Sequence, residues 1–175
     1  MDAAAPAHWP ADTCEPVLET TVGSVLRAAA AAVPEHTAIV AWGATPAERR
    51  SWTFAQLLGE AERAARALLA RFAPGEHVAV YAHNIPEWLL LELGAGLAGL
   101  VLVTINPASR ARELEYVLRR SRAAGLFHVA SFRGNPLGEW VEEVRSGLRR
   151  CARSMPSRTG TGFLHRPRPA LRCHA

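Results

Sequence analysis

From residue 77 onward, a short apolar run followed by a segment of helical character occurs three times in succession. The apolar runs lack the strict alternation of a half-exposed strand, which is typical of strands covered on both faces of a parallel sheet. Because parallel strands need crossovers, the repeat predicts an α/β fold, a layered parallel sheet with flanking helices. The expected strands lie at 77–82, 101–105 and 125–130, and the expected helices at 86–99, 110–122 and 137–148.

The region before this repeat predicts a helix, two strands and a longer helix. A first helix over 21–33 ends at Pro34, since proline lacks the N–H that a continuing helix needs. A strand over 37–41 then leads through a polar turn into a second strand that ends at Thr53. Thr53 and Gln56 match a capping box, which begins the longer helix.

Apolar residues at helical spacing mark the faces that two helices turn toward the core. The longer helix has Leu57, Ala61, Ala64, Leu68 and Phe72 on one face, and the helix over 110–122 has Leu114, Val117, Leu118 and Ser121. Opposite charges four residues apart predict ion pairs on the outer faces, Glu62 with Arg66 and Glu115 with Arg119.

All 20 basic residues are arginines, and the absence of lysine excludes any mechanism that needs one. Residues 1–148 hold 13 arginines and all 16 acids, whereas residues 149–175 hold seven arginines and no acid. The excess of arginines over acids lies entirely in residues 149–175. The net positive charge of the chain is therefore weak evidence that residues 1–148 bind nucleic acid or an anionic membrane. We divide the chain into a loose arm over 1–20, a folded region over 21–148 and a basic tail over 149–175.

The tail over 149–175 has no hydrophobic period, and three interpretations of it stay open. It is a solvated disordered segment, a basic arm that binds nucleic acid, or the product of a shifted reading frame. A shifted frame in a G/C-rich gene yields mixtures of arginine, proline, histidine and cysteine, and it fits the arginine bias best.

Side chains that commonly hold metals or act as nucleophiles are scattered along the chain. Cys14, Cys151 and Cys173 have no CxxC spacing and leave an odd thiol, which argues against a disulfide framework or a zinc site. The histidines form no HxH, HxxxH or HExxH pattern, and no serine lies in a GxSxG elbow. We therefore predict no catalytic, cofactor-binding or metal-binding residue and, without a secretory signal, a cytoplasmic location.

The apolar segment 88–105 has about the length of a membrane span, yet Glu92 would place a carboxylate near the bilayer centre. We therefore expect no transmembrane helix. Gly94, Gly96 and Gly99 match GxGxxG, but that fingerprint must follow a strand and open a helix, whereas these glycines follow a helical stretch. Close packing of the helix on a strand is their expected use, in preference to a dinucleotide site.

Five segments, in one order along the chain, resemble motifs of the adenylate-forming acyl-CoA synthetases, the AMP-dependent synthetases and ligases. They are Ser-Trp-Thr-Phe-Ala-Gln-Leu at 51–57, His-Asn-Ile-Pro-Glu-Trp at 83–88, the run over 93–107, Arg-Glu-Leu-Glu-Tyr-Val-Leu at 112–118, and Phe-Arg-Gly-Asn-Pro at 132–136. The last is similar to fatty-acyl-CoA ligases in particular. The resemblance implies the N-terminal portion of that fold.

The resemblance also implies a two-step ligation, in which a fatty or other carboxylic acid and ATP form an acyl-adenylate, and coenzyme A then displaces AMP. Such sites need a Thr-Ser-Gly-Thr-Thr-Gly-x-Pro-Lys-Gly phosphate loop, acids that hold ribose and Mg²⁺, and a mobile lysine, none of which is present. Residues 157–162 have only a superficial likeness to the loop. We expect a truncated synthetase that is inactive alone and takes no cofactor; the alternative is a small non-enzymatic α/β interaction module with a basic arm.

An incomplete synthetase would leave the apolar faces of its helices uncovered. We expect this exposure at Leu89, Leu90, Leu93, Leu97 and Leu114. The predicted partners are accordingly a complementary synthetase fragment or further copies of the chain, and not nucleic acid.

Overall fold

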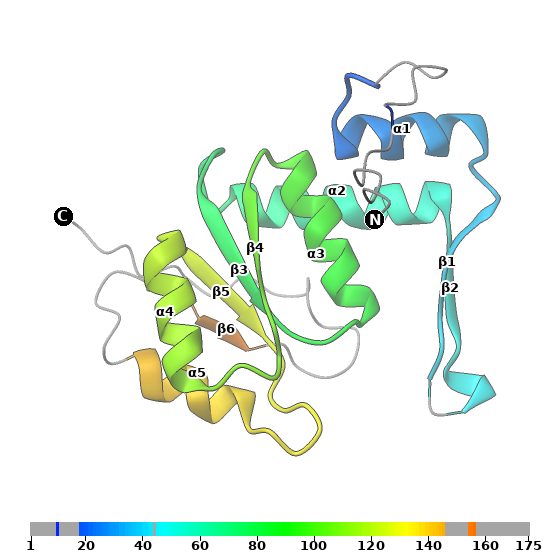
Figure 1. Ribbon diagram of the computed structural model, residues 1–175. Coiled ribbons are helices and arrows are strands. Elements are labelled where there is room, and N and C mark those ends of the chain that lie inside the picture. Colours follow the sequence, from blue (N-terminus) through cyan, green and yellow to red (C-terminus); the bar gives the residue numbers. More distant parts are fainter. Residues whose placement is uncertain (1–9, 11–17, 44, 146–153, 157–175) are drawn as a thin grey trace, which may run out of the picture.

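A sheet of parallel strands lies at the centre of the computed structural model (Figure 1), which describes residues 10, 18–43, 45–145 and 154–156. Its strands are β3 (His77–Tyr81), β4 (Val101–Ile105), β5 (Gly125–His128) and β6 (Ser154–Pro156), in the order β4-β3-β5-β6. Every neighbouring pair in this sheet is parallel. The expected α/β fold with a layered parallel sheet is therefore confirmed.

Strand β6 lies within the segment that the sequence divides off as a basic tail. Ser154 pairs with Leu126 of β5, so these three residues extend the sheet by one short strand. The other residues of 149–175, and most of the arm over 1–20, lie outside the described residues. The three-part division of the chain and the interpretations of its tail stay predictions.

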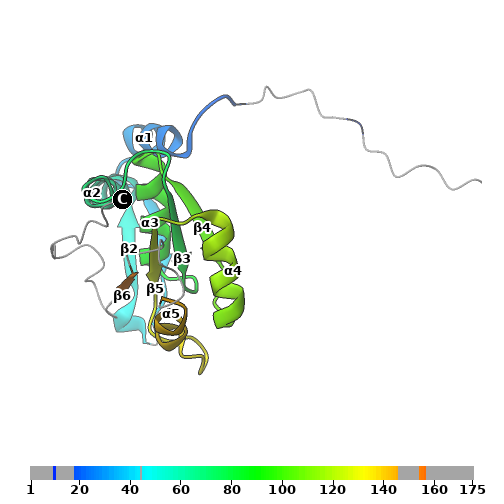
Figure 2. The same ribbon diagram turned by 90° about the vertical axis from the view of Figure 1, so that its left-hand side faces the viewer.

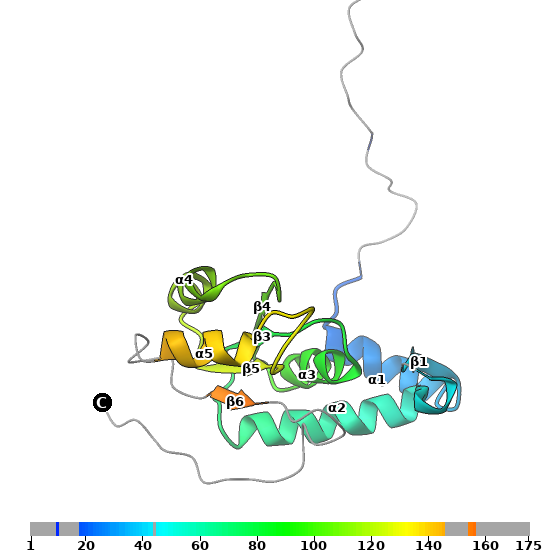
Figure 3. The same cartoon turned by 90° about the horizontal axis from the view of Figure 1, so that it is seen from below.

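Helices cover both faces of the sheet. α2 (Phe54–Leu69) and α3 (Pro86–Leu97) pack against each other on one side, and α4 (Ala111–Ser121) and α5 (Leu137–Arg145) lie on the other. Figure 2 shows α2, the strands and α4 as successive layers, and Figure 3 shows these layers from below. The chain passes from β3 through α3 to β4 and returns through α4 to β5, which places the two crossovers on opposite faces.

The N-terminal elements form a separate unit beside α2. α1 (Val22–Ala32) lies along α2, and an antiparallel hairpin of β1 (Thr37–Ala41) and β2 (Arg50–Thr53) extends away from the sheet, at the right of Figure 1. The short 3₁₀ helix η1 (Pro46–Glu48) lies between the two strands of the hairpin. These boundaries agree with the helix and the two strands that the sequence predicts there.

Two side-chain contacts fix where the hairpin meets the helices. The Thr53 hydroxyl accepts the Gln56 N–H at 3.3 Å, and the Gln56 side chain accepts the Thr53 N–H at 3.0 Å, so the predicted capping box is confirmed. Arg50 Nη1 donates to Glu87 Oε1 at 2.9 Å, in the first turn of α3. The hairpin is therefore held at the start of α2 and also at the start of α3.

The larger of two apolar cores surrounds β3. The last four residues of β3, Val78, Ala79, Val80 and Tyr81, are each 0% or 1% exposed, because this strand has neighbouring strands along both edges and helices over both faces. The predicted inner face of α2 is buried at Leu57, Ala61, Ala64 and Leu68, with Phe72 beyond its end, and that of α4 is buried at Leu114 and Leu118. Val117 and Ser121 of α4 are half-buried.

The expected exposure is wrong for Leu114 and Leu93 and holds only in part for the other three leucines. Leu114 is fully buried under α4, and Leu93 is 9% exposed. Leu89, Leu90 and Leu97 are half-buried. Leu93 belongs to a second, smaller core with Leu26 and Leu57, so α1 and α2 cover the side of α3 that we expected to be open.

One of the two predicted helical ion pairs forms and the other does not. Arg119 Nη2 lies 2.7 Å from Glu115 Oε1, as the spacing predicts. Glu62 pairs instead with Arg27 of α1, at 3.7 Å, and the predicted Glu62–Arg66 pair is wrong. The reason is tertiary, because α1 lies along α2 and brings a second cation to the same carboxylate.

The apolar segment 88–105 divides between α3 and β4, as the sequence predicts. Within the ranges that the structure describes, no helix is both long and apolar enough to cross a membrane. The break falls at Gly99, whose φ of +68° is a left-handed conformation that favours glycine.

Gly94 serves the contact between two helices rather than the expected contact between a helix and a strand. A Cβ at this position would lie 2.5 Å from the Ala64 Cβ and 3.2 Å from the Ala61 carbonyl oxygen, both on α2. At Gly96, two residues further along α3, a Cβ would meet nothing within 4 Å. The expectation that these glycines pack on a strand is therefore wrong, because the side of α3 that bears Gly94 faces α2.

The close contact at Gly94 and the open space at Gly96 predict that a substitution by alanine has opposite effects on stability at the two positions. Gly94→Ala is expected to lower the free energy of unfolding by about 1–3 kcal/mol, because the added methyl group must separate α2 from α3. Gly96→Ala has room for the methyl group and is expected to raise it by about 0.5–1 kcal/mol through helix propensity. Urea unfolding of both variants measures the difference, and equal midpoints would contradict the close helix contact.

Candidate functional site

Three parallel strands end side by side, and the loops that follow them meet at one edge of the sheet, the lower edge in Figure 1. Tyr81 ends β3 and is paired with Ile105, which ends β4, and with His128, which ends β5. In open α/β sheets, ligands bind outside the carboxyl ends of the strands. The candidate site is therefore the edge formed by the loops 82–85, 106–110 and 129–136.

Tyr81 connects two of these strand ends. Its hydroxyl donates to the backbone carbonyl of Ser109, in the loop that leads into α4. Burial, with a smaller contribution from the Glu113 carboxylate, raises the pKa of Tyr81 to about 12. The hydroxyl therefore keeps its proton at neutral pH and acts as a fixed donor that holds the loop on β3.

The loop after β5 contains a tight two-residue turn. Phe132 and Asn135 exchange backbone hydrogen bonds of 3.0 and 2.9 Å, and the two residues between them have φ angles of 48° (Arg133) and 80° (Gly134). Two left-handed residues in succession are typical of a type I′ turn. Arginine adopts this conformation only at an energetic cost, and strain of this kind clusters at binding and switch regions.

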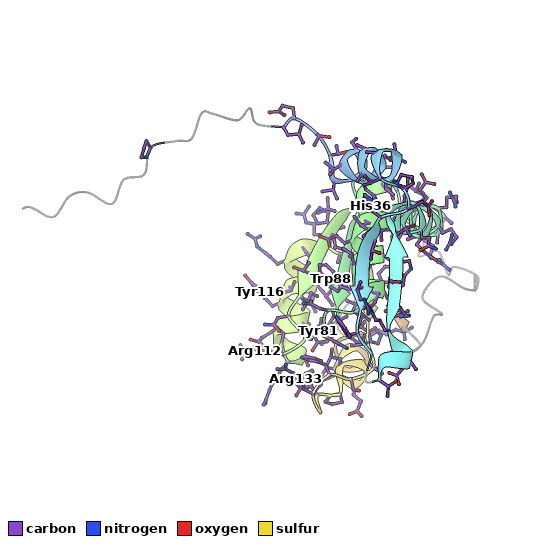
Figure 4. All side chains as sticks on the ribbon, turned by 90° about the vertical axis from the view of Figure 1, so that its right-hand side faces the viewer. His36, Tyr81, Trp88, Arg112, Tyr116 and Arg133 are labelled. Atoms are coloured by element: carbon purple, nitrogen blue, oxygen red, sulfur yellow. The ribbon has the colours of Figure 1, made fainter. Side chains whose placement is uncertain are left out.

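This turn places an aromatic ring and a cation beside the end of β3. The rings of Phe132 and His83 stack with centroids 4.8 Å apart and planes inclined by 18°, and the Arg133 guanidinium lies 5.1 Å from the Phe132 ring centre. Figure 4 shows Arg133 at the same end of the molecule as Arg112 of α4. Rings stacked with a guanidinium offer a surface for planar or anionic groups, so the arrangement is suited to binding and positioning.

The described residues leave one ring nitrogen of His83 without a partner. Its Nδ1 is buried and makes no hydrogen bond with any described residue. Buried polar atoms are normally paired, so this atom marks an unsatisfied polar group at the end of β3. Across the part of the chain that the structure describes, no group of three or more histidine, cysteine or acidic side chains could hold a metal ion.

His128 lies beneath the site. It is 5% exposed, and its Nδ1 donates to the Val129 carbonyl at 3.1 Å, since a carbonyl can only accept. Burial lowers the pKa of His128 below its ordinary value of 6.5, against weaker opposing effects of the Val129 carbonyl and the Glu142 carboxylate. The imidazole is therefore held in its neutral form under α5.

Further residues of the types considered in the sequence, histidine, serine and cysteine, lie as follows. His77 lies at the far end of β3, where its Nδ1–H donates to the Ser121 carbonyl oxygen at 2.7 Å. Ser109 contributes its backbone carbonyl, which accepts from the Tyr81 hydroxyl. The three cysteines and residues 157–162 lie outside the described residues. That the chain holds no catalytic, cofactor-binding or metal-binding residue stays a prediction.

Sequence reasoning missed the Tyr81–Ser109 contact and the stack of His83 with Phe132. The Tyr81 contact joins residues 28 positions apart and has no local signal. The turn over 132–135 did have a local sequence signal, because a glycine directly before Asn135 and between two apolar segments is typical of a hairpin turn.

The family model for AMP-binding enzymes matches residues 26–159, which include every element of the fold from α2 to α5. The chain belongs to the AMP-binding enzyme family. The resemblance to adenylate-forming synthetases is therefore confirmed, and it applies to the N-terminal region of such enzymes.

Relatives of this AMP-binding chain carry names that agree with one another. The Bacillus subtilis protein YngI, whose name places it among the acyl-CoA synthetases, is 35% identical over 129 residues, which are 73% of this chain and 23% of that protein. The human medium-chain acyl-CoA ligase ACSF2, mitochondrial, is 37% identical over 114 residues, which are 65% of this chain and 18% of that protein. The chain thus spans about a fifth of the length of these relatives.

Solved structures also match this chain to the N-terminal region of such enzymes. The N-terminal domain of FACL13 from Mycobacterium tuberculosis superposes with a TM-score of 0.72 at 25% identity, over 88% of this chain and 39% of that one. A Mycobacterium tuberculosis fatty acyl-CoA synthetase superposes with a TM-score of 0.71 at 26% identity, over 87% of this chain and 30% of that one. The fold described above is therefore that of the N-terminal region of acyl-CoA ligases.

The hydrogen bond of Tyr81 predicts that loss of its hydroxyl lowers stability more than loss of the Tyr116 hydroxyl does. Tyr81→Phe is expected to lower the free energy of unfolding by about 1–2 kcal/mol, because it removes the donor to the Ser109 carbonyl. Tyr116→Phe is the matched control, since Tyr116 is 67% exposed on α4, and it is expected to change the value by less than about 0.5 kcal/mol. Chemical unfolding measures both, and equal losses would contradict the role given to Tyr81.

His128 predicts a loss of stability in acid. Because its pKa is lower in the folded chain than in the unfolded one, the unfolded chain binds the proton more readily. Stability is therefore complete above the ordinary pKa of about 6.5 and falls as the pH drops through that value toward the lower folded one. His128→Gln is expected to show a smaller decrease in melting temperature between pH 7.5 and pH 5.5.

His36→Gln is the control for this measurement, because His36 is exposed between α1 and β1 (Figure 4). It is expected to behave as the unsubstituted protein does. The same pH dependence in all three proteins would show that burial of His128 does not govern acid stability.

Proposed function

We propose that this chain provides the N-terminal scaffold of an acyl-CoA synthetase that activates a fatty or other carboxylic acid with ATP and transfers it to coenzyme A. The observation that carries the proposal is the family match over residues 26–159. The names of the relatives support the acyl-CoA chemistry, and those named as medium-chain ligases support a fatty acid as the substrate. The alternative, a small interaction module, has no support in these comparisons.

We also propose that the chain by itself catalyses neither half-reaction. Both half-reactions build negative charge on phosphate or carboxylate oxygens and need preorganised donors and a cation there. The 175 residues contain no lysine and no Pro-Lys-Gly phosphate loop. The groups that perform the chemistry would come from a complementary synthetase segment.

The described residues have a positioning role in this proposal. β3 fixes the ends of β4 and β5 in register, Tyr81 holds the loop before α4, and the stack of His83 with Phe132 holds the loop after β5. A rigid strand edge of this kind gives a bound substrate a constant frame, which is how scaffold residues contribute to a reaction that other groups perform.

The location of the protein is also a proposal. A cytoplasmic location is our expectation from the sequence, while the relatives include a bacterial protein and several that are named as mitochondrial. The comparisons therefore leave more than one compartment for the family, and the expectation rests on the sequence alone.

The purified chain is expected to show no octanoate-dependent exchange of labelled pyrophosphate into ATP, because it lacks the phosphate loop and every lysine. The complete human medium-chain ligase, assayed in parallel, is the positive control. Exchange clearly above a blank without protein would contradict the inactivity of the chain and would show that other residues replace the missing loop.

A further inference from the structure

The outer face of α4 carries a row of three large side chains that project into solvent. Arg112, Tyr116 and Arg120 lie four residues apart, so they form one line along the helix. All three are exposed, Tyr116 by 67%, and Figure 4 shows Arg112 and Tyr116 on the outer side of α4. Leu114 and Leu118, on the opposite face, are buried and hold the row in a fixed orientation.

Helix stability accounts for only one member of this row. Arg120 lies in the last turn, where the helix macrodipole favours a cation. Arg112 is the second residue of the helix, where the same dipole disfavours a cation, and Tyr116 leaves most of an aromatic ring in water. Residues that oppose local preferences without compensation within the fold are expected at functional sites.

No carboxylate among the described residues pairs with the two arginines of the row. Among the described residues, neither Arg112 nor Arg120 has a carboxylate oxygen within 4.0 Å, whereas Arg119 is bound to Glu115. Residues 110–122 hold five arginines and two glutamates, while the rest of the first 148 residues has more acids than arginines. Within residues 1–148, positive charge is therefore concentrated on this helix and its two flanking residues.

The positive row is narrow. Glu113 borders it on one side and accepts the Arg110 N–H at 2.8 Å, and Glu115 borders it on the other side, paired with Arg119. A membrane or a nucleic acid presents negative charge over a broad surface and would meet these carboxylates as well. A single line of carboxylates would avoid them, and residues four apart on an α-helix form such a line.

We propose that the outer face of α4 is a docking surface for an acidic α-helix of a partner protein. Arg112 and Arg120 each pair with a carboxylate of that helix, and Tyr116 packs against it between them. The two arginines are about 12 Å apart along the helix axis, so carboxylates two turns apart on the partner reach both. Arginine and tyrosine are also enriched at protein interfaces. This inference is independent of the acyl-CoA chemistry proposed above.

The test measures binding of two labelled peptides to the full chain by fluorescence anisotropy. One is an alanine-rich helical peptide of about 20 residues with glutamate at every fourth position, and the other has the same composition in scrambled order. The full chain is expected to bind the ordered peptide more tightly than the scrambled one. R112A/R120A is expected to weaken binding of the ordered peptide about tenfold.

R63A/R66A on α2 is the matched control, because it removes the same charge from exposed positions on the other side of the sheet and is expected to keep full binding. The seven arginines of 149–175 are present in every variant and add the same background. Tyr116→Ala is expected to weaken binding and Tyr116→Phe to retain it, since the ring and not the hydroxyl makes the contact. Circular dichroism shows that each variant is folded.

Three results would overturn the proposal. They are equal binding of the ordered peptide by the unsubstituted chain and by R112A/R120A, equal binding of the ordered and the scrambled peptide, and loss upon R112A/R120A of binding to phosphatidylserine vesicles or to polyuridylate without any effect on the peptide. The last result would assign the row to a membrane or to nucleic acid.

Discussion

Burial of β3 on both faces and along both edges is the constraint on which the rest of the structure depends. Its residues 78–81 are 0% or 1% exposed, so every position on the strand must be apolar or, like Tyr81, have its polar atom satisfied. The strand sets the register of β4 on one side and of β5 on the other. Both crossovers, and the loops at their ends, are positioned by that register.

The contact between α2 and α3 extends this order to the N-terminal unit. Gly94 lets the two helix backbones approach at Ala61 and Ala64, and α2 in turn carries α1 and begins at the end of the hairpin. The ion pair of Arg50 with Glu87 adds a second attachment of the hairpin. Each half of the N-terminal unit is therefore fixed relative to the strand edge where the candidate site lies.

Much of the fold could be predicted from the sequence, because the signals are local. The capping box at Thr53 and Gln56, the stop at Pro34 and the apolar face of α4 each depend on residues within a few positions of one another. The order of the motifs over 51–136 also identified the family, and the family match confirms it. The candidate site was harder to predict from the sequence, since its contacts join the ends of β3 and β5 through residues such as His83 and Phe132, which are about 50 positions apart.

The sequence by itself determined the elements from α1 to α5, their order, the parallel pairing and the family, because spacing, caps and motifs are properties of neighbouring residues; strand β6 was not predicted. Only the tertiary structure decided which residues meet across elements. In the tertiary structure, Glu62 pairs with Arg27 rather than with Arg66, Gly94 lies against α2 rather than against a strand, and α1 and α2 cover Leu93. Each of these outcomes depends on the direction in which a helix presents one face to a distant neighbour, and periodicity shows that a face exists without showing what covers it.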